Sequence, residues 1–192
     1  MIVTQKTIRY SLYTIFISLL TVVMTMKGYA EQKVQIEESA STSKYETYMN
    51  ILVGIARRNP HRAPFVAMII NEKEDKLLCL GMNDSGTNPV LHGEIDAINR
   101  CVELHPNIDW STTTLLTTAE PCPMCASAMM WAGIPRIVYG TSIETLVRKG
   151  WSQIDIDTLE IIRRTPFHQA EVISDVLSHM TDPLFDREII EE

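Results

Sequence analysis

Two spacings of hydrophobic residues alternate along the chain, and each predicts its own kind of element. Apolar residues three or four positions apart predict helices, and short continuous apolar runs predict buried strands. The helical segments are KYETYMNILVGIARRN, HGEIDAINRCVELH, CPMCASAMMWAG and SIETLVRKG, and the strand segments are PFVAMIIN, KLLCLGMN, TTTLLTTA and RIVYGT. The turn EKED makes the first two strands a hairpin. Strands that alternate with helices predict a βαβ sheet that is covered on both faces.

Residues that begin and end helices support the same boundaries. Asn59-Pro60 ends the first helical segment, because proline disfavours the helical conformation in the residue before it. Gly133 closes the third segment, and Ser142 is placed to cap the start of the fourth. No internal repeat or low-complexity region interrupts this order, so one folded domain is expected.

The first thirty residues differ in character from the rest. Lys6 and Arg9 precede an uncharged run at residues 10–26, and the small residues Gly28 and Ala30 follow it. This is the layout of a secretory signal peptide, with cleavage expected after Ala30. An uncleaved membrane anchor is the alternative, but it needs about 18 apolar residues or more. Serine and threonine dilute the shorter run found here.

Cleavage would leave a polar linker at residues 31–43 and a folded domain at residues 44–192. The expected product is secreted or periplasmic, with no membrane segment once the leader is removed. Disulfides persist outside the cytoplasm. If the protein is exported, its cysteines can be oxidised to disulfides. The four cysteines are Cys79, Cys101, Cys122 and Cys125.

Charge and composition narrow the class of partner. The chain has 192 residues, of which 45% are hydrophobic and 21% charged, values typical of a globular domain. The net charge is −7, and since residues 1–30 hold three cations and no acid, the remainder carries −10. Nucleic-acid affinity rests largely on lysine and arginine that neutralise phosphates. A nucleic-acid partner is therefore disfavoured, and a small neutral substrate is favoured.

The pair Cys122 and Cys125 in AEPCPMCASAM admits three interpretations: half of a structural zinc site, a redox disulfide, or part of a catalytic metal centre. A structural zinc site needs four protein ligands, but the chain has no second C-x-x-C and no two histidines with the H-x(3–5)-H spacing. A redox pair is expected early in a thioredoxin-like domain. This pair follows three predicted strands and leaves LHGEIDA unexplained, so the catalytic interpretation is favoured.

The motif His92-Gly93-Glu94 supplies the remaining parts of a catalytic centre. It opens one predicted helix, and Cys122 and Cys125 open the next one along the sheet. Helix starts in parallel βα units lie at the same sheet edge, so one nitrogen and two sulfurs can converge there. Three protein ligands leave the fourth tetrahedral position of a zinc ion to water, and helix N-termini favour thiolates. Glu94 is expected to move protons without binding the metal.

The order H-x-E and then P-C-x-x-C is a zinc-deaminase signature. The segments LHGEIDAI, TTAEPCPMCASAMMWAGIPRIVYGT and TPFHQ together resemble the cytidine deaminase-like superfamily, in its branch of small nucleobase and nucleoside deaminases. The resemblance covers residues 45–170 and is strongest to guanine deaminase and nucleoside deaminase relatives, while LHGEI and AGIPR are also similar to small zinc cytosine deaminases. It implies a three-layer α/β/α sandwich with a mixed five-stranded sheet, one Zn²⁺ per subunit and a homodimer.

The resemblance also implies roles for residues outside the two motifs. Asn83, at the end of the second strand, matches an asparagine that hydrogen-bonds the base, and the backbone of Cys122 and of Ala119–Glu120 lines the pocket. The Glu120 carboxylate is expected to fix the metal-binding loop. His168 stands where relatives carry an aromatic residue that caps the active site, in some cases that of a neighbouring subunit. A contact with the base is expected there, and an exposed polar tail residue is the alternative.

Residues near these motifs carry weaker expectations. Core packing, rather than a platform for a base, is expected for Met129, Met130 and Trp131. Trp151, after the turn at Gly150, and Glu144 are within reach of the pocket along the chain, but a place in it is not favoured for either.

Three further residues of interest are small: Gly93, Cys79 and Cys101. Gly93 replaces the commoner alanine of the family motif, a small-for-small change that is expected to leave the chemistry intact. Cys79 and Cys101 are expected to be buried thiols. A disulfide between them is the alternative that export keeps open.

These residues predict hydrolytic deamination of a free nucleobase or nucleoside, with guanine or guanosine favoured because of the TPFHQ segment. Hydroxide activated by zinc would attack the amino-bearing ring carbon, Glu94 would shuttle the proton, and ammonia would leave. The alternatives are an exported deaminase that acts on cytosine or cytidine, on nucleic acid, or on another cyclic amine such as a pterin. A non-catalytic zinc-binding module is disfavoured because Glu94 is present.

Overall fold

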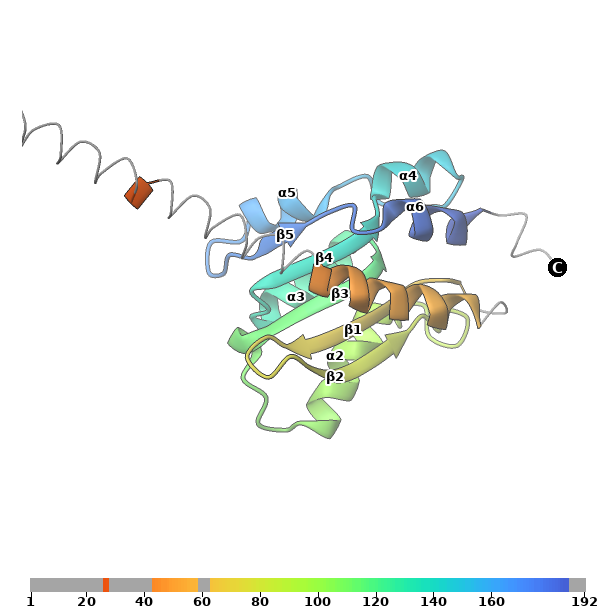
Figure 1. Cartoon of the computed structure of the whole chain (residues 1–192). Coiled ribbons are helices and arrows are strands. Elements are labelled where there is room, and N and C mark those ends of the chain that lie inside the picture. Colours follow the sequence, from red (N-terminus) through yellow and green to blue (C-terminus); the bar gives the residue numbers. More distant parts are fainter. Residues whose placement is uncertain (1–25, 28–42, 59–62, 187–192) are drawn as a thin grey trace, which may run out of the picture. The chain divides into compact units, whose positions relative to one another are not determined.

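The structure is a computed structural model that describes residues 26–27, 43–58 and 63–186 (Figure 1). The predicted signal peptide lies outside the described residues apart from Met26 and Lys27, and so does the predicted linker apart from Ser43. The chain divides into two compact units, Met1–Ser43 and Lys44–Glu192, and the second holds the elements described below. None of the described helices is both long and apolar enough to cross a lipid bilayer.

Five strands in the described part of the chain form one mixed sheet, in the order β2-β1-β3-β4-β5. They are β1 (Val66–Asn71), β2 (Lys76–Met82), β3 (Thr113–Ala119), β4 (Arg136–Thr141) and β5 (Glu171–Ile173). β1 is antiparallel to both β2 and β3, whereas β3, β4 and β5 are parallel to one another. The predicted mixed five-stranded sheet is confirmed, although the hydrophobic pattern did not indicate β5.

Helices cover both faces of this sheet, which gives the expected three layers. In Figure 1 the helix at residues 44–57, in orange, lies on one face, and α2 and α3 lie on the other. The remaining elements are α2 (Gly93–Leu104), η1 (Trp110–Thr112), α3 (Pro123–Ala132), α4 (Ile143–Arg148), α5 (Thr158–Arg163), α6 (Ser178–Thr181) and η2 (Asp182–Phe185).

The sandwiched position of β1 explains its uninterrupted hydrophobic sequence. Ala67 and Ile69 belong to the hydrophobic cluster on the α2 and α3 side, while Met68 and Ile70 belong to the cluster on the side of the helix at 44–57. Successive side chains of a strand point to opposite faces, so a strand buried on both faces has apolar residues at every position.

The expected helix ends of α3 and α4 are present, but one side chain of α3 is not where it was predicted. Gly133 adopts φ 78° and ends α3, and the Ser142 hydroxyl accepts a hydrogen bond from the Thr145 N–H at 3.1 Å. Met129 is fully buried, whereas Trp131 is 78% exposed and stacks on Phe167 with ring centroids 4.6 Å apart. The core prediction is wrong for Trp131, because two residues along a helix turn its side chain to the opposite face.

Cys79 and Cys101 form a disulfide, so the expectation of buried thiols is wrong. The bond links β2 to the last turn of α2, with the Cα atoms 5.5 Å apart. Close packing of α2 on β2 brings the two cysteines together. A Cβ on Gly81 of β2 would lie 2.1 Å from the Gly93 carbonyl oxygen and 2.2 Å from the Ala97 nitrogen, so only glycine fits there.

Candidate active site

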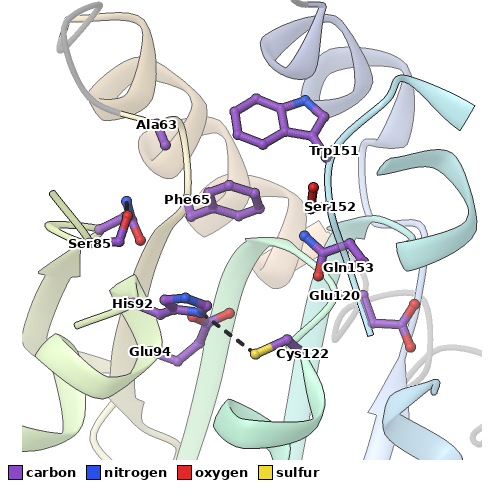
Figure 2. Close-up of a pocket in the computed structure, with 11 residues that line it drawn as sticks. Ala63, Phe65, Ser85, His92, Glu94, Glu120, Cys122, Trp151, Ser152 and Gln153 are labelled. Atoms are coloured by element: carbon purple, nitrogen blue, oxygen red, sulfur yellow. Dashed lines mark hydrogen bonds between the residues drawn. The ribbon is translucent and has the colours of Figure 1, made fainter. Parts of the chain in front are cut away.

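Two of the predicted metal ligands are the residues that immediately precede helices. His92 precedes α2 and Cys122 precedes α3, and both have extended backbone conformations (ψ 162° and 165°). Side chains at such positions commonly accept hydrogen bonds from the helix backbone. Neither His92 nor Cys122 does so, and both side chains are therefore available to a ligand at the same edge of the sheet (Figure 2).

His92, Cys122 and Cys125 converge at this edge. His92 Nδ1 lies 3.6 Å from the Sγ atom of each cysteine, and the three donor atoms lie within 4.8 Å of one another. Zinc bond lengths of about 2.3 Å to sulfur and about 2.0 Å to nitrogen, at tetrahedral angles, place a nitrogen and a sulfur ligand about 3.6 Å apart. The donor set and its spacing therefore fit a zinc ion with a fourth position left open.

The two thiols are prepared for a metal in different ways. A hydrogen bond from Cys125 and the nearby His92 ring lower the pKa of Cys122 to about 4. The same hydrogen bond, together with burial, raises the pKa of Cys125. Cys122 thus favours the thiolate form that binds a metal, whereas Cys125 has to lose its proton when a metal binds.

Glu94 lies in the first turn of α2, beside the three donors. Its side chain is 3% exposed, and Oε1 accepts a hydrogen bond from the Thr117 hydroxyl at 3.2 Å. Burial raises the pKa of Glu94 above the usual value for a glutamate. Figure 2 shows its carboxylate close to the His92 ring at the floor of the pocket, where it can exchange a proton with a bound molecule.

A glycine at position 93, between His92 and Glu94, has a packing role that was not predicted from the sequence. A Cβ at this position would lie 2.7 Å from the carbonyl oxygen of Phe65, just before β1. Glycine therefore lets the start of α2 approach the start of β1 more closely than alanine would. The substitution for the commoner alanine is more than a neutral exchange of small residues.

Glu120 holds the metal-binding loop, as expected. Its carboxylate is buried and accepts hydrogen bonds from two backbone N–H groups, those of Ile143 at the start of α4 and Thr158 at the start of α5, both at 2.9 Å. The Thr158 hydroxyl in turn donates to the Pro121 carbonyl at 3.2 Å. One carboxylate thus ties two helix starts to the loop that carries Cys122.

A cavity of about 180 Å³ opens above His92, Cys122 and Glu94. Its lining residues are Ala63, Phe65, Asn83, Ser85, His92, Glu94, Glu120, Cys122, Trp151, Ser152 and Gln153. Asn83 was predicted to lie here. Its position is fixed by the backbone bond from its N–H to the Phe65 carbonyl at 3.0 Å, and its Nδ2 donates to the Ser85 hydroxyl at 3.0 Å.

Trp151 was not favoured as a pocket residue from the sequence, and Phe65, Ser85, Ser152 and Gln153 were not predicted to line the pocket. Figure 2 shows the Phe65 and Trp151 rings above the floor of the pocket, with Gln153 and Ser85 on opposite sides. Gly150, directly before Trp151, was the available signal in the sequence, because glycine often marks a turn. In the structure it adopts φ 81°.

His168 and Glu144 do not line this pocket. His168 Nε2 lies 3.0 Å from the Ile134 carbonyl oxygen, and the segment that carries it leads into β5. Because β5 is parallel to β4, its beginning lies at the edge opposite the site. A contact between His168 and a base would therefore require a neighbouring subunit. Glu144 lies on a separate hollow with Asp155 and Asp157.

Residues 42–141 match the family described as the cytidine and deoxycytidylate deaminase zinc-binding region. The chain belongs to this family. A probable cytosine deaminase of Schizosaccharomyces pombe is 29% identical over 98 residues, which cover 51% of this chain and 59% of that protein. A guanine deaminase of Bacillus subtilis is 27% identical over 134 residues, which cover 65% of this chain and 85% of that protein.

A solved structure of a guanine deaminase from Nitrosomonas europaea shares the fold. It has a TM-score of 0.64 at 21% identity and covers 76% of this chain and 84% of its own. The predicted α/β architecture of this deaminase family is confirmed by that likeness. The matched segment spans about six-tenths of the length of the S. pombe relative.

Proposed function

We propose that this family member is a zinc-dependent deaminase that hydrolyses the amino group of a free nucleobase or nucleoside and releases ammonia. The observation that carries the proposal is a buried, hydrogen-bonded Glu94 beside a His/Cys/Cys donor set at the floor of a cavity of about 180 Å³. Guanine or guanosine is the favoured substrate, supported by the B. subtilis guanine deaminase, 85% of which is matched by this chain.

His92, Cys122 and Cys125 would hold one zinc ion per subunit. A zinc ion bound there supplies a Lewis acid that lowers the pKa of water towards neutrality. Glu94 takes up a proton from the water twice at its carboxylate, and passes the first to a ring nitrogen and the second to the departing amine, which its raised pKa favours. Phe65 and Trp151 confine the flat ring, and Asn83 binds its edge.

The lining of the pocket supports an uncharged substrate. Among the described lining residues there is no lysine or arginine, and the charged side chains are acids. A phosphate group would gain no cationic partner from these residues. A base or nucleoside is therefore favoured over a nucleotide.

We also propose that the protein works outside the cytoplasm, as the leader at residues 1–30 suggests. The disulfide between Cys79 and Cys101 supports an oxidising compartment. A homodimer is proposed as well. The exposed Trp131 and Phe167 pair offers an apolar surface next to α3 that a second copy would cover.

Cytosine or cytidine is the second candidate substrate, since the S. pombe relative is a probable cytosine deaminase. The test is ammonia release by purified, zinc-loaded protein on guanine, guanosine, cytosine, cytidine, adenine and adenosine. Release from guanine or guanosine is expected. If no ammonia were released from any of the six compounds, with one zinc bound per chain, the proposal would be contradicted.

A further inference from the structure

Thr117 is a polar residue in a buried part of β3, the central strand of the sheet. It lies on the same face of β3 as Leu115, two residues earlier, which belongs to the hydrophobic cluster on the α2 and α3 side. Thr117 is fully buried, and it pairs with Ala67 of β1 and Tyr139 of β4. A hydroxyl in such surroundings costs free energy unless it forms a hydrogen bond.

The Thr117 hydroxyl forms this hydrogen bond with Glu94. Its Oγ1 donates to Glu94 Oε1 at 3.2 Å, and among the described residues Glu94 is the partner of this hydroxyl. The adjacent Thr118 instead donates to the Pro64 carbonyl at 2.7 Å. Of these two neighbouring hydroxyls on β3, that of Thr117 is therefore the one that contacts the floor of the pocket.

The Glu94 carboxylate needs such a contact because the backbone alone does not fix its orientation. Glu94 lies in the first turn of α2, and three rotatable bonds separate its Cα from the carboxylate. Thr117 is more rigid, because a threonine is restricted at χ1 and β3 has a hydrogen-bonded strand on each side. The hydroxyl is therefore a fixed point that can orient the longer side chain.

The Cys125 thiol also donates to Glu94, but it cannot take over this role when a metal is bound. Cysteine binds a metal as a thiolate, which has no proton to donate. The backbone N–H of Glu94 donates to the carboxylate as well, but it belongs to the same residue. Of these donors, Thr117 is the one that holds the carboxylate from a separate element of the fold.

We propose that Thr117 is a positioning residue that holds the Glu94 carboxylate in the orientation needed for proton transfer. This inference rests on the proposed function. A catalytic group has to be held within about 0.5 Å of its productive geometry, and a displacement of about 1 Å can lower the rate by about 100-fold. Thr117 does not line the cavity, so it acts through Glu94 and not by contact with a substrate.

Thr117→Val tests the inference, because it replaces the hydroxyl by a methyl group and valine suits a buried strand. On the substrate identified among the six compounds, kcat is expected to fall by about 10- to 100-fold while KM stays within about twofold. Zinc content and melting temperature should not change. Thr117→Ser keeps the donor but is less restricted at χ1, so it is expected to restore kcat to within about threefold of the unmodified protein.

Thr114→Val is the matched control, since it makes the same substitution on the same strand. The Thr114 hydroxyl donates to the carboxylate of Glu72, at the opposite edge of the sheet. Its loss is expected to lower the melting temperature and to leave kcat unchanged.

An unchanged kcat in Thr117→Val, or a loss that Thr117→Ser does not restore, would overturn the inference. A loss of activity that accompanies loss of zinc or a lower melting temperature would overturn it as well, because Thr117 would then support the fold rather than orient Glu94.

If the unmodified protein releases ammonia from none of the six compounds, the proposed function fails, and the position of Glu94 then decides whether Thr117 holds it. Crystal structures of the zinc-loaded unmodified protein and of zinc-loaded Thr117→Val are compared in that case. A Glu94 carboxylate displaced by about 1 Å or more, or present in two conformers, would uphold the inference. An unchanged carboxylate would overturn it.

Discussion

Two glutamates, one partly and one almost fully buried, lie at opposite edges of the sheet and have different surroundings. Glu72, just after β1, accepts hydrogen bonds from Lys44 at 2.9 Å, from Tyr45 at 2.8 Å and from the Thr114 hydroxyl. Arg136 adds an ion pair at 3.3 Å. Burial alone would raise the pKa of Glu72, but these donors outweigh it and lower the pKa to about 2.

Glu94, at the other edge, has no lysine or arginine partner among the described residues. It is almost fully buried, and its hydrogen-bond donors are the Thr117 hydroxyl at 3.2 Å, the Cys125 thiol and its own backbone N–H. Burial dominates and raises its pKa. A carboxylate that joins elements is paired with basic side chains and stays charged, whereas one that must accept and release protons near neutral pH has only neutral donors.

Removing a metal ligand should abolish catalysis at the Glu94 edge and leave the Glu72 edge unaffected. This change has the largest expected effect on activity. Cys125→Ala leaves two protein ligands, which is too few for a stable zinc site. Deamination is expected to fall by roughly 10⁴-fold or more, because enzymes owe at least about 10⁶-fold to their catalytic groups. Zinc content by atomic absorption and ammonia release on the same sample check this. One bound zinc together with normal turnover would contradict the assigned ligands.

Removing the disulfide should change stability without changing the chemistry. The bond between Cys79 and Cys101 spans 22 residues and lies at the end of α2 far from Glu94. The double variant Cys79→Ala/Cys101→Ala is expected to lose about 3 kcal/mol of unfolding free energy. The melting temperature should fall by roughly 10 °C, with kcat/KM unchanged below the transition. Calorimetry and activity assays measure both, and an equally stable variant would show that the bond contributes nothing to the fold.

Glu72→Gln, at the opposite edge of the sheet, should lower the free energy of unfolding by a smaller amount than loss of the disulfide does. The pKa of Glu72 is about 2 when folded and near 4.5 otherwise, so its charge stabilises the protein above pH 4.5 and that stabilisation is lost as the pH falls towards 2. With 24% of the side chain exposed, solvent screening reduces the loss at pH 7 to about 2 kcal/mol.

The difference in stability between Glu72→Gln and the unmodified protein should therefore shrink as the pH falls below 4.5. Urea unfolding at pH 7 and at pH 3.5 measures it. A difference that stays constant with pH would show that Glu72 acts through packing rather than through its charge.

The parts of this molecule that depend on neighbours in the sequence were predictable. Four strands followed from apolar runs, and His92, Glu94 and the two cysteines followed from short motifs at helix starts, where a parallel sheet edge brings ligands together. The Ser142 cap was predictable for the same reason, since its partner Thr145 is three residues away.

The parts that depend on distant packing were not predictable. β5 has three residues, too few for a periodic signal. The disulfide depends on how closely Gly81 lets α2 approach β2. Trp151 and Gln153 reach the pocket because Phe185, over thirty residues later, anchors the Trp151 ring, and His168 misses it because β5 runs parallel to β4.

Proton transfer by Glu94 at a metal-holding site can be tested with Glu94→Gln measured beside Glu72→Gln. We expect Glu94→Gln to keep its zinc and its melting temperature while ammonia release falls by about 10³- to 10⁴-fold, since a neutral amide tolerates burial. Glu72→Gln should show the reverse, with full activity and a lower melting temperature. If Glu94→Gln kept more than a tenth of the activity with zinc bound, Glu94 would not be the group that moves the proton.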